Sequence, residues 1–530
     1  MRFTKFAFAA AFGAALATGP LAVAPASAET VLKAVMHSDV KIIDPIWTTA
    51  YISRNVGYMI YDTLFALDAK NEVKPQMVDK VDISADKLTY TMTLRDGLLW
   101  HDGQPVTAAD CVQSLKRWSA KDSLGQKVFT GFVSEISAPD AKTIVIKLKE
   151  PTGLLLFALA KPSSNVPFMM PKRVAETDPG KQISEFIGSG PFVLKKDEWK
   201  PGDKIVFTKF DKYKPRSEPA SGFAGGKVVK VDRVEWLAIA DAQQAVNALS
   251  AGEIDYMEQP PHDLLPLIKG DSNLKIVVNS GTGQFTFRPN SLVPPFNNPK
   301  IKQALWYALN QEDFLKATVG NSEYYKVCKS FYPCGTPLAT TAGMDGLLTG
   351  NSKKAQELLK AAGYDGTPIV LMASTDLPIL TNLGPVAKQL LERAGFKVDM
   401  QSMDWQTLVA RRNKKDMPNA GGWNAFDTAW VGADILNPVL MAYMNAACDK
   451  ALFGWPCDEK IEKLRSAFMK APDLAAQKKI AEEAQLAAIA YTTLFRSIPL
   501  GEYSAPMAVR KNIDGIIDAP VPVFWNITKK

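Results

Sequence analysis

Residues 352–402 read SKKAQELLKAAGYDGTPIVLMASTDLPILTNLGPVAKQLLERAGFKVDMQS, and this stretch decides the fold class. Its hydrophobic spacing predicts a helix, a strand, a helix and a strand, over 352–363, 368–373, up to Gly395, and 396–402. Helices that alternate with strands in this way indicate an α/β domain with a largely parallel sheet.

The same alternation continues toward the C-terminus, with a helix from about Trp405 and a strand near 425–431. In open α/β sheets, ligands bind beyond the carboxyl ends of the strands. Trp405 follows one predicted strand, and Trp430, Asp434 and Asn437 follow the next. Aromatic side chains with a few placed polar groups are typical of a small-molecule cleft, although packing in the core is an equal alternative for each tryptophan.

The first half of the chain reads mostly as β-strands with turns. TYTMTLRDGLLWHDGQPVTAADCVQSLKRW (89–118) begins with strand alternation and ends in a helix that we expect Thr107 to cap. Further elements are expected as strands at 143–148, 190–195 and 204–210, and as a helix between Asp241 and Gly252. Asn298 and Pro299 then open one helix that carries Ile301, Leu305, Leu309 and Phe314 on a single face.

The N-terminus resembles an export signal. Residues 1–28 combine a basic start, an Ala-rich apolar middle and a small-x-small site at 26–28, so we expect a cleaved signal peptide and a periplasmic location. The mature chain would begin near Glu29 and hold 502 residues, enough for two or three domains. Its charge falls from +7 to +5 and is spread along the chain, which argues against nucleic acid as a partner.

Five cysteines are present, and an oxidising compartment favours disulfides between near neighbours. We expect Cys328 to pair with Cys334 and Cys448 with Cys457, leaving Cys111 as a buried thiol. None of the spacings is C-x-x-C, so no metal site is expected.

Signatures of catalysis are missing from the sequence. The chain contains no G-x-S-x-G, no H-E-x-x-H and no P-loop, and it has three histidines. His101 lies next to Asp102, but a tight turn before a capped helix explains this pair better than acid–base chemistry. We therefore expect no catalytic residues, no enzyme activity and no cofactor.

Several longer blocks resemble the peptide/dipeptide/nickel-binding family (family 5) of extracytoplasmic solute-binding proteins that serve ABC importers. The blocks that carry the resemblance, in order, are YDTLFALDAKNEVKPQMVDKVDIS (61–84), YTMTLRDGLLWHDGQPVTAADCVQSLKRW (90–118), IGSGPFVL (187–194), ALSAGEIDY (248–256), PPFNNPKIKQALWYALNQEDFL (294–315), LLKAAGYDG (358–366), the glycine turn before Val398, IPLGEY (498–503) and Trp525. They span nearly all of the mature chain.

The resemblance implies an α/β, two-lobed periplasmic-binding-protein fold of type II, with a hinged cleft between the lobes. The first lobe would cover 29–280 and include an extra domain at about 70–190, the second lobe 281–495, and the chain would return to the first lobe over 496–530. The protein would enclose a peptide or a similar small polar organic solute and, as a monomer, deliver it to an ABC permease at the inner membrane.

The resemblance also points to a ligand site with one departure from the family. Dipeptide binders hold the ligand amine with an Asp in a loop similar to GWTGD, whereas Ala433 stands there in this chain and Asp434 follows one residue later. We expect the cleft to be lined by Trp47, Thr49, Tyr51, Arg288, Trp405, Trp430, Asp434 and Asn437. The tryptophans would stack on the ligand, Asp434 would take a cation or hydroxyl, and Arg288 would take a carboxylate.

Two other functions stay open on the sequence alone. A secreted hydrolase or amidase acting on peptides would show turnover, and a chaperone-like or adhesive protein on the same fold would bind unfolded chains. The ligand, its affinity and the cognate permease are not specified by the sequence.

Overall fold

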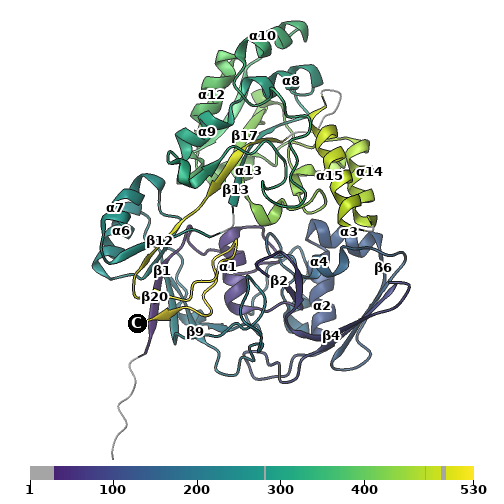
Figure 1. Cartoon of the computed structure of the whole chain (residues 1–530), viewed down its shortest axis with the longest axis vertical. Coiled ribbons are helices and arrows are strands. Elements are labelled where there is room, and N and C mark those ends of the chain that lie inside the picture. The colour runs from purple at the N-terminus through teal and green to yellow at the C-terminus, as the bar shows by residue number, and fades with distance from the viewer. Residues whose placement is uncertain (1–28, 280–281, 472, 491–496) are drawn as a thin grey trace, which may run out of the picture.

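The computed structural model describes residues 29–279, 282–471, 473–490 and 497–530, so the expected signal peptide lies outside the described residues. The chain forms two lobes, the upper and lower halves of the molecule in Figure 1. Each lobe is built on one large mixed sheet with helices around it, which confirms the α/β two-lobed fold class.

The lower lobe contains a seven-stranded sheet. Its strands lie in the order β12 (Leu274–Val277), β19 (Met507–Arg510), β11 (Tyr256–Glu258), β1 (Val31–Val35), β10 (Arg233–Leu237), β9 (Lys204–Lys209) and β8 (Phe192–Leu194). The helices α1 (Tyr51–Ile60), α6 (Ala242–Ala251) and α7 (Leu265–Gly270) belong to the same lobe. As expected, Asp241 caps α6 and Gly252 ends it in the left-handed region at φ 81°.

The upper lobe contains a six-stranded sheet. Its order is β14 (Tyr325–Lys326), β18 (Ile498–Ser504), β13 (Thr282–Pro289), β17 (Ala425–Val431), β15 (Ile369–Ser374) and β16 (Val398–Met403). Only the pairs of β15 with β16 and β17 are parallel, and the other three pairs are antiparallel. The expectation of a largely parallel sheet was therefore wrong. β13 enters this sheet directly from the other lobe and β18 leaves it directly for that lobe, so neither strand is joined to a parallel neighbour through a helical crossover.

The upper lobe is covered by helices. These are α8 (Pro299–Ala308), α9 (Gln311–Thr318), α10 (Ser352–Ala361), α11 (Pro378–Thr381), α12 (Leu383–Arg393), α13 (Trp405–Arg411), α14 (Glu459–Lys470) and α15 (Leu474–Ile489). The single helix expected after Asn298 is two helices, because Leu309 is extended and Asn310 caps a new helix that starts at Gln311, its side chain accepting from the Glu312 N–H.

The chain passes between the two large sheets at two places, from β12 to β13 and from β18 to β19. Because β18 pairs with β13, we propose that the return to the first lobe comes after Ser504 rather than at 496. These two crossings are the candidates for the hinge.

A separate four-stranded sheet lies at the lower right of Figure 1. Its order is β4 (Val78–Ile83), β5 (Thr89–Leu94), β7 (Thr143–Leu148) and β6 (Val133–Ser137), and its helices are α2 (Ala108–Ser119), α3 (Ser123–Gly131), α4 (Leu155–Leu159) and α5 (Lys172–Ala175). Thr107 caps α2 in a capping box with Asp110, as expected. We propose that this sheet and its helices are the extra domain expected at about 70–190. Two small ribbons, β2 (Phe65–Leu67) with β3 (Val73–Pro75) and β20 (Ile513–Asp514) with β21 (Thr528–Lys529), complete the described strands.

His101 has the structural role that the sequence favours. Its Nε2 lies 3.1 Å from the Gly190 carbonyl, and its Nδ1 accepts from the Gly188 N–H at 3.3 Å. Burial lowers the pKa of His101 to about 4, so the ring is neutral and holds the glycine loop of the IGSGPFVL block. That loop crosses the end of α1 closely: a Cβ on Gly188 would lie 2.0 Å from the Ile60 carbonyl oxygen.

Within the described ranges, no helix is both long enough and apolar enough to span a bilayer.

Candidate functional site

The segment before α1 is held by a buried ion pair. Asp44 accepts hydrogen bonds from the backbone N–H groups of Ile46 and Trp47 at 3.0 and 3.2 Å, and it pairs with Arg117 at 2.7 Å. The Arg117 and Asp44 side chains are 1% and 0% exposed. Because Arg117 lies on α2, the pair fixes the start of α1, and therefore Tyr51, against the extra domain.

Asp434 joins the two lobes. It follows β17 in a short 3₁₀ turn (Gly432–Asp434), and its carboxylate accepts hydrogen bonds from Tyr51 at 2.8 Å, Ser164 at 2.8 Å and Ser163 at 3.2 Å. All three hydroxyls come from segments of the first lobe. Asp434 is only 2% exposed, and both of its carboxylate oxygens accept hydrogen bonds across the interface between the lobes.

Arg54 contacts two of the residues that bind Asp434. Its Nη1 donates to Ser163 at 2.6 Å, and its guanidinium carbon lies 4.3 Å from the centroid of the Tyr51 ring. Burial, and then the Asp434 charge, raise the pKa of Tyr51 well above its ordinary value. The phenol therefore stays protonated and donates a hydrogen bond to the carboxylate. Arg54 thus offsets the buried Asp434 charge through one intervening serine.

Arg288 lies in a second cluster, on the face of β13 that also carries Gln284 and Thr286. It is 1% exposed, and its Nη2 donates to the Phe453 carbonyl at 2.9 Å, while Nε and Nη1 have no partner among the described residues. Burial first, and the nearby Arg412 second, lower the pKa of Arg288 to about 9. A buried cation with two unused donors is the expected form of a carboxylate-binding residue.

Trp405 and Trp430, both in the second lobe, lie next to this second cluster. Trp405 begins α13 and lies against the Arg412 guanidinium, whose central carbon is 5.4 Å from its ring centroid. Trp430 is half-buried at the end of β17, its ring lies 5.5 Å from the Tyr443 ring, and its Nε1 has no partner in the described structure.

The other expected residues have different surroundings. Trp47 donates through Nε1 to the Gly180 carbonyl at 3.0 Å, and Thr49 is exposed. Asn437 is buried, and its side-chain oxygen accepts from the backbone N–H groups of Val439 and Leu440, so it stabilises a turn. The structure therefore brings together Tyr51 with Asp434, and Arg288 with Trp405 and Trp430, while the ligand-binding roles of all eight stay a prediction.

Arg54, Ser163 and Ser164 were missed in the sequence. The only local signal is the polar run Pro162–Asn165, which follows an apolar stretch. That run resembles any surface turn, and nothing in it indicates a partner 270 residues away.

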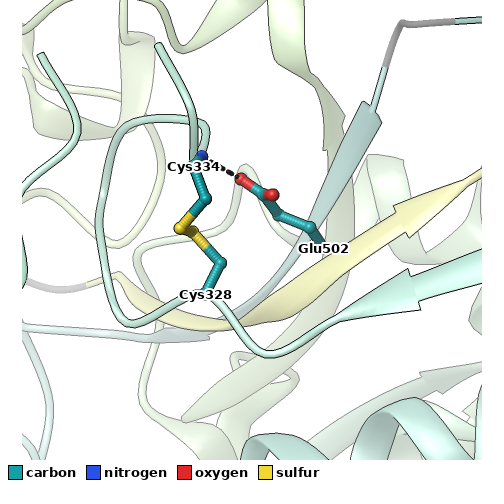
Figure 2. A group of neighbouring side chains, drawn as sticks. All are labelled: Cys328, Cys334 and Glu502. Atoms are coloured by element: carbon teal, nitrogen blue, oxygen red, sulfur yellow. Dashed lines mark hydrogen bonds between the residues drawn. A yellow bond between two sulfur atoms is a disulfide. The ribbon is translucent and has the colours of Figure 1, made fainter. Parts of the chain in front are cut away.

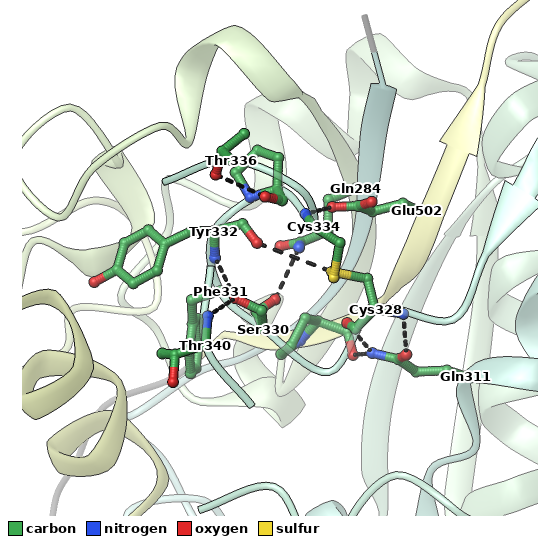
Figure 3. The surroundings of a disulfide bond; sticks show 12 residues. Gln284, Gln311, Cys328, Ser330, Phe331, Tyr332, Cys334, Thr336, Thr340 and Glu502 are labelled. Carbon is green, nitrogen blue, oxygen red and sulfur yellow. Dashed lines mark hydrogen bonds between the residues drawn. A yellow bond between two sulfur atoms is a disulfide. The ribbon is translucent and has the colours of Figure 1, made fainter. Parts of the chain in front are cut away.

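Both expected disulfides are present, and Cys111 is a buried free thiol. The Cys328–Cys334 bridge lies beside Glu502 of β18, whose Oε1 accepts from the Cys334 N–H at 2.8 Å (Figure 2). Around the bridge, Gln311 accepts from the Cys328 N–H at 2.9 Å and donates to the Cys328 carbonyl at 2.9 Å (Figure 3). The two sulfurs and the Glu502 carboxylate form the one group of three potential metal ligands in the described chain, but sulfurs joined to each other are not thiolates.

Because of Glu502, the free energy of unfolding should decrease as the pH rises. Burial raises the pKa of Glu502 from 4.5 to about 7 in the folded protein. Between these values the folded state binds more protons than the unfolded state, so the free energy of unfolding decreases as pH rises from about 4.5 to about 7. A Glu502→Gln variant, which keeps an oxygen for Cys334, should gain about 3 kcal/mol over the wild type across this window.

Urea unfolding of both proteins at several pH values from 4.5 to 8 measures this difference. The control is Glu459→Gln on α14, an exposed side chain whose change should leave the pH dependence as it is. A difference between Glu502→Gln and wild type that does not vary with pH would contradict the assignment.

Comparisons with known proteins agree with the sequence resemblance. Residues 72–451, more than half of the chain, match the family described as bacterial extracellular solute-binding proteins, family 5 Middle. The protein named "Probable peptide ABC transporter periplasmic-binding protein y4tO" of Sinorhizobium fredii (strain NBRC 101917 / NGR234) is 40% identical, and the alignment covers 98% of this chain and 97% of that protein.

Two solved structures share the fold. The periplasmic binding protein DppA from Helicobacter pylori, in complex with the peptide STSA, superimposes with a TM-score of 0.78 at 21% identity over 94% of this chain and 98% of that one. A dipeptide binding protein from Pseudoalteromonas sp. SM9913, in complex with Met-Leu, gives a TM-score of 0.78 at 18% identity over 94% and 100%.

Proposed function

This chain belongs to family 5 of the bacterial extracellular solute-binding proteins, and on that premise we propose that it captures a peptide or a similar small polar solute between its lobes and delivers it to an ABC permease. The observation that supports enclosure is the Asp434 contact, in which one buried carboxylate of the second lobe accepts from three hydroxyls of the first. Because Asp434 and its three partners lie in different lobes, this contact is expected to form only when the lobes close.

The proposed ligand contacts follow from the two clusters. Arg288, with two unused buried donors, takes a ligand carboxylate, and Trp405 and Trp430 belong to the aromatic surroundings of this cluster. Asp434 was expected to hold a cation or hydroxyl of the ligand, but its acceptors are already used by Tyr51, Ser163 and Ser164. We therefore assign Asp434 to lobe closure, and an amine of the ligand would have to share it.

We further propose that the protein works as a monomer in the periplasm, after removal of residues 1–28, and without catalysis or a cofactor. The named relative is a binding protein, which gives the rival hydrolase function no support. An adhesive or chaperone-like role would not need a cleft that closes.

The test is native mass spectrometry of the protein purified from its own host, followed by calorimetry with synthetic di- and tripeptides. Release of one small molecule of defined mass, and peptide binding without cleavage products, are the expected results. Binding only to unfolded polypeptide, or turnover of the peptides, would refute the proposal.

A further inference from the structure

Arg412 is a second arginine beside Arg288; it is half-buried, and its Nε is fully buried. It follows α13, and its guanidinium carbon lies 4.0 Å from the centroid of the Phe453 ring, while that of Arg288 lies 5.9 Å from the same centroid. The neighbouring Arg411 contrasts with it, because Arg411 donates to the carbonyls of Gly421 and Gly422 and to the Gln401 side chain. All three guanidinium nitrogens of Arg411 donate hydrogen bonds within the fold, whereas the buried Nε of Arg412 has no acceptor among the described residues.

Neither Arg288 nor Arg412 forms an ion pair with a carboxylate in the part of the chain that the structure describes. The buried carboxylate of Asp427 lies on β17 close in sequence, but it pairs opposite Phe287 and so projects from the other face of the sheet. Taking a cation out of water costs several kcal/mol unless an anion compensates it, and two adjacent cations repel each other as well. Burial lowers the pKa of Arg288 to about 9 and that of Arg412 to about 10, as expected for uncompensated charges.

Several buried hydrogen-bond donors without an acceptor in the described chain lie on the side of the upper-lobe sheet that carries Arg288. The buried atoms without a partner among the described residues include Nε and Nη1 of Arg288, Nε of Arg412, Nε1 of Trp430 and Oγ1 of Thr286. Thr286, Arg288 and Trp430 project from the same side of the paired strands β13 and β17, since Thr286 and Gln284 lie opposite Thr428 and Trp430. Buried donors without acceptors are rare in folded proteins, and here they are nearly all of the type that binds oxyanions.

The loop between Cys448 and Cys457 packs against the two arginines. Its Phe453 carbonyl accepts from Arg288, its Gly454 carbonyl accepts from the Ser291 N–H at 3.0 Å, and the disulfide closes its base. Gly454 has φ +93°, and a Cβ there would lie 3.1 Å from the Pro289 carbonyl oxygen. The loop is therefore fixed against the end of β13 and holds the Phe453 ring against both guanidinium groups.

We propose that Arg288 and Arg412 form one anion-binding subsite that takes the carboxylate-bearing end of the ligand and prefers an end with two carboxylates, such as a C-terminal Asp or Glu. The proposal rests on the solute-binding function above. A single α-carboxylate compensates one of the two guanidinium charges, whereas a second carboxylate makes the buried site neutral. Arg412 is then a specificity-determining residue, and Arg288 the shared carboxylate contact.

Calorimetry with Ala-Ala, Ala-Glu and C-terminally amidated Ala-Ala tests the subsite, together with glutarate as a dicarboxylate that lacks a peptide bond. The wild type should bind Ala-Glu at least tenfold more tightly than Ala-Ala, and amidation should weaken binding at least tenfold. Arg412→Met should remove the preference for Ala-Glu, and Arg412→Lys should keep part of it. Lys415→Met is the control, because this exposed cation lies on the Trp455 ring outside the subsite.

Each outcome decides the proposal. Equal affinity for Ala-Glu and Ala-Ala, or a preference that survives in a folded Arg412→Met protein, would overturn it. Binding of glutarate that depends on Arg412, without binding of any peptide, would support the subsite and refute the peptide function. If the wild type binds neither glutarate nor any of the peptides, both proposals fail.

Discussion

An Asp434→Ala variant is expected to bind its ligand about a hundredfold more weakly than the wild type and to favour separated lobes. The Asp434 carboxylate accepts three hydrogen bonds from the first lobe, and a hydrogen bond to a charged group contributes roughly 1.5–3 kcal/mol. Part of this is recovered by hydration when the lobes open, which leaves about 3 kcal/mol in favour of closure. Since the donors and the acceptor lie in different lobes, the loss acts on closure and not on the folding of either lobe.

Calorimetry with the co-purified ligand and small-angle scattering with and without it measure the two effects. Asp427→Asn is a matched control on the same strand. Burial raises the pKa of Asp427 well above its ordinary value, which favours the neutral acid, and we expect an amide of the same shape to replace it with little change. Wild-type affinity and compaction in Asp434→Ala would show that the contact does not control closure.

The sequence was sufficient for the local elements and for the region of the site, but not for the contacts between lobes. Caps at Thr107 and Asp241 were predictable because their partners lie three residues away. The break between α8 and α9 was missed because the apolar face continues across Leu309 while only the Asn310 cap marks the new helix.

Asp434 itself was found because it follows a predicted strand, yet its partners were not. Tyr51 lies 383 residues away, and no local pattern specifies such a pairing. Likewise, Arg288 was among the residues expected to line the cleft, whereas Arg412, which follows Arg411 directly in the sequence, was not. Only the packing of the Cys448–Cys457 loop shows that Arg412 lies against Phe453 while Arg411 is bound by backbone carbonyls.

An Arg117→Met variant is expected to lose about 3–5 kcal/mol of unfolding free energy, the cost of removing one partner from a buried ion pair. Arg117 donates to both oxygens of Asp44 and to the carbonyls of Thr177 and Lys181. Methionine fills much of the space but leaves the Asp44 carboxylate buried with backbone N–H donors as its remaining partners. Urea unfolding followed by circular dichroism measures the loss.

Two further proteins separate the ion pair from simple packing. Arg117→Met combined with Asp44→Asn should be more stable than Arg117→Met alone, because the uncompensated charge is gone. Arg173→Met removes an exposed pair with Glu185 in the same domain and should cost less than about 1 kcal/mol. If Arg117→Met and Arg173→Met cost the same, the pair does not fix the start of α1; if only Arg117→Met also lowers ligand affinity, the effect passes from Asp44 through that segment to Tyr51.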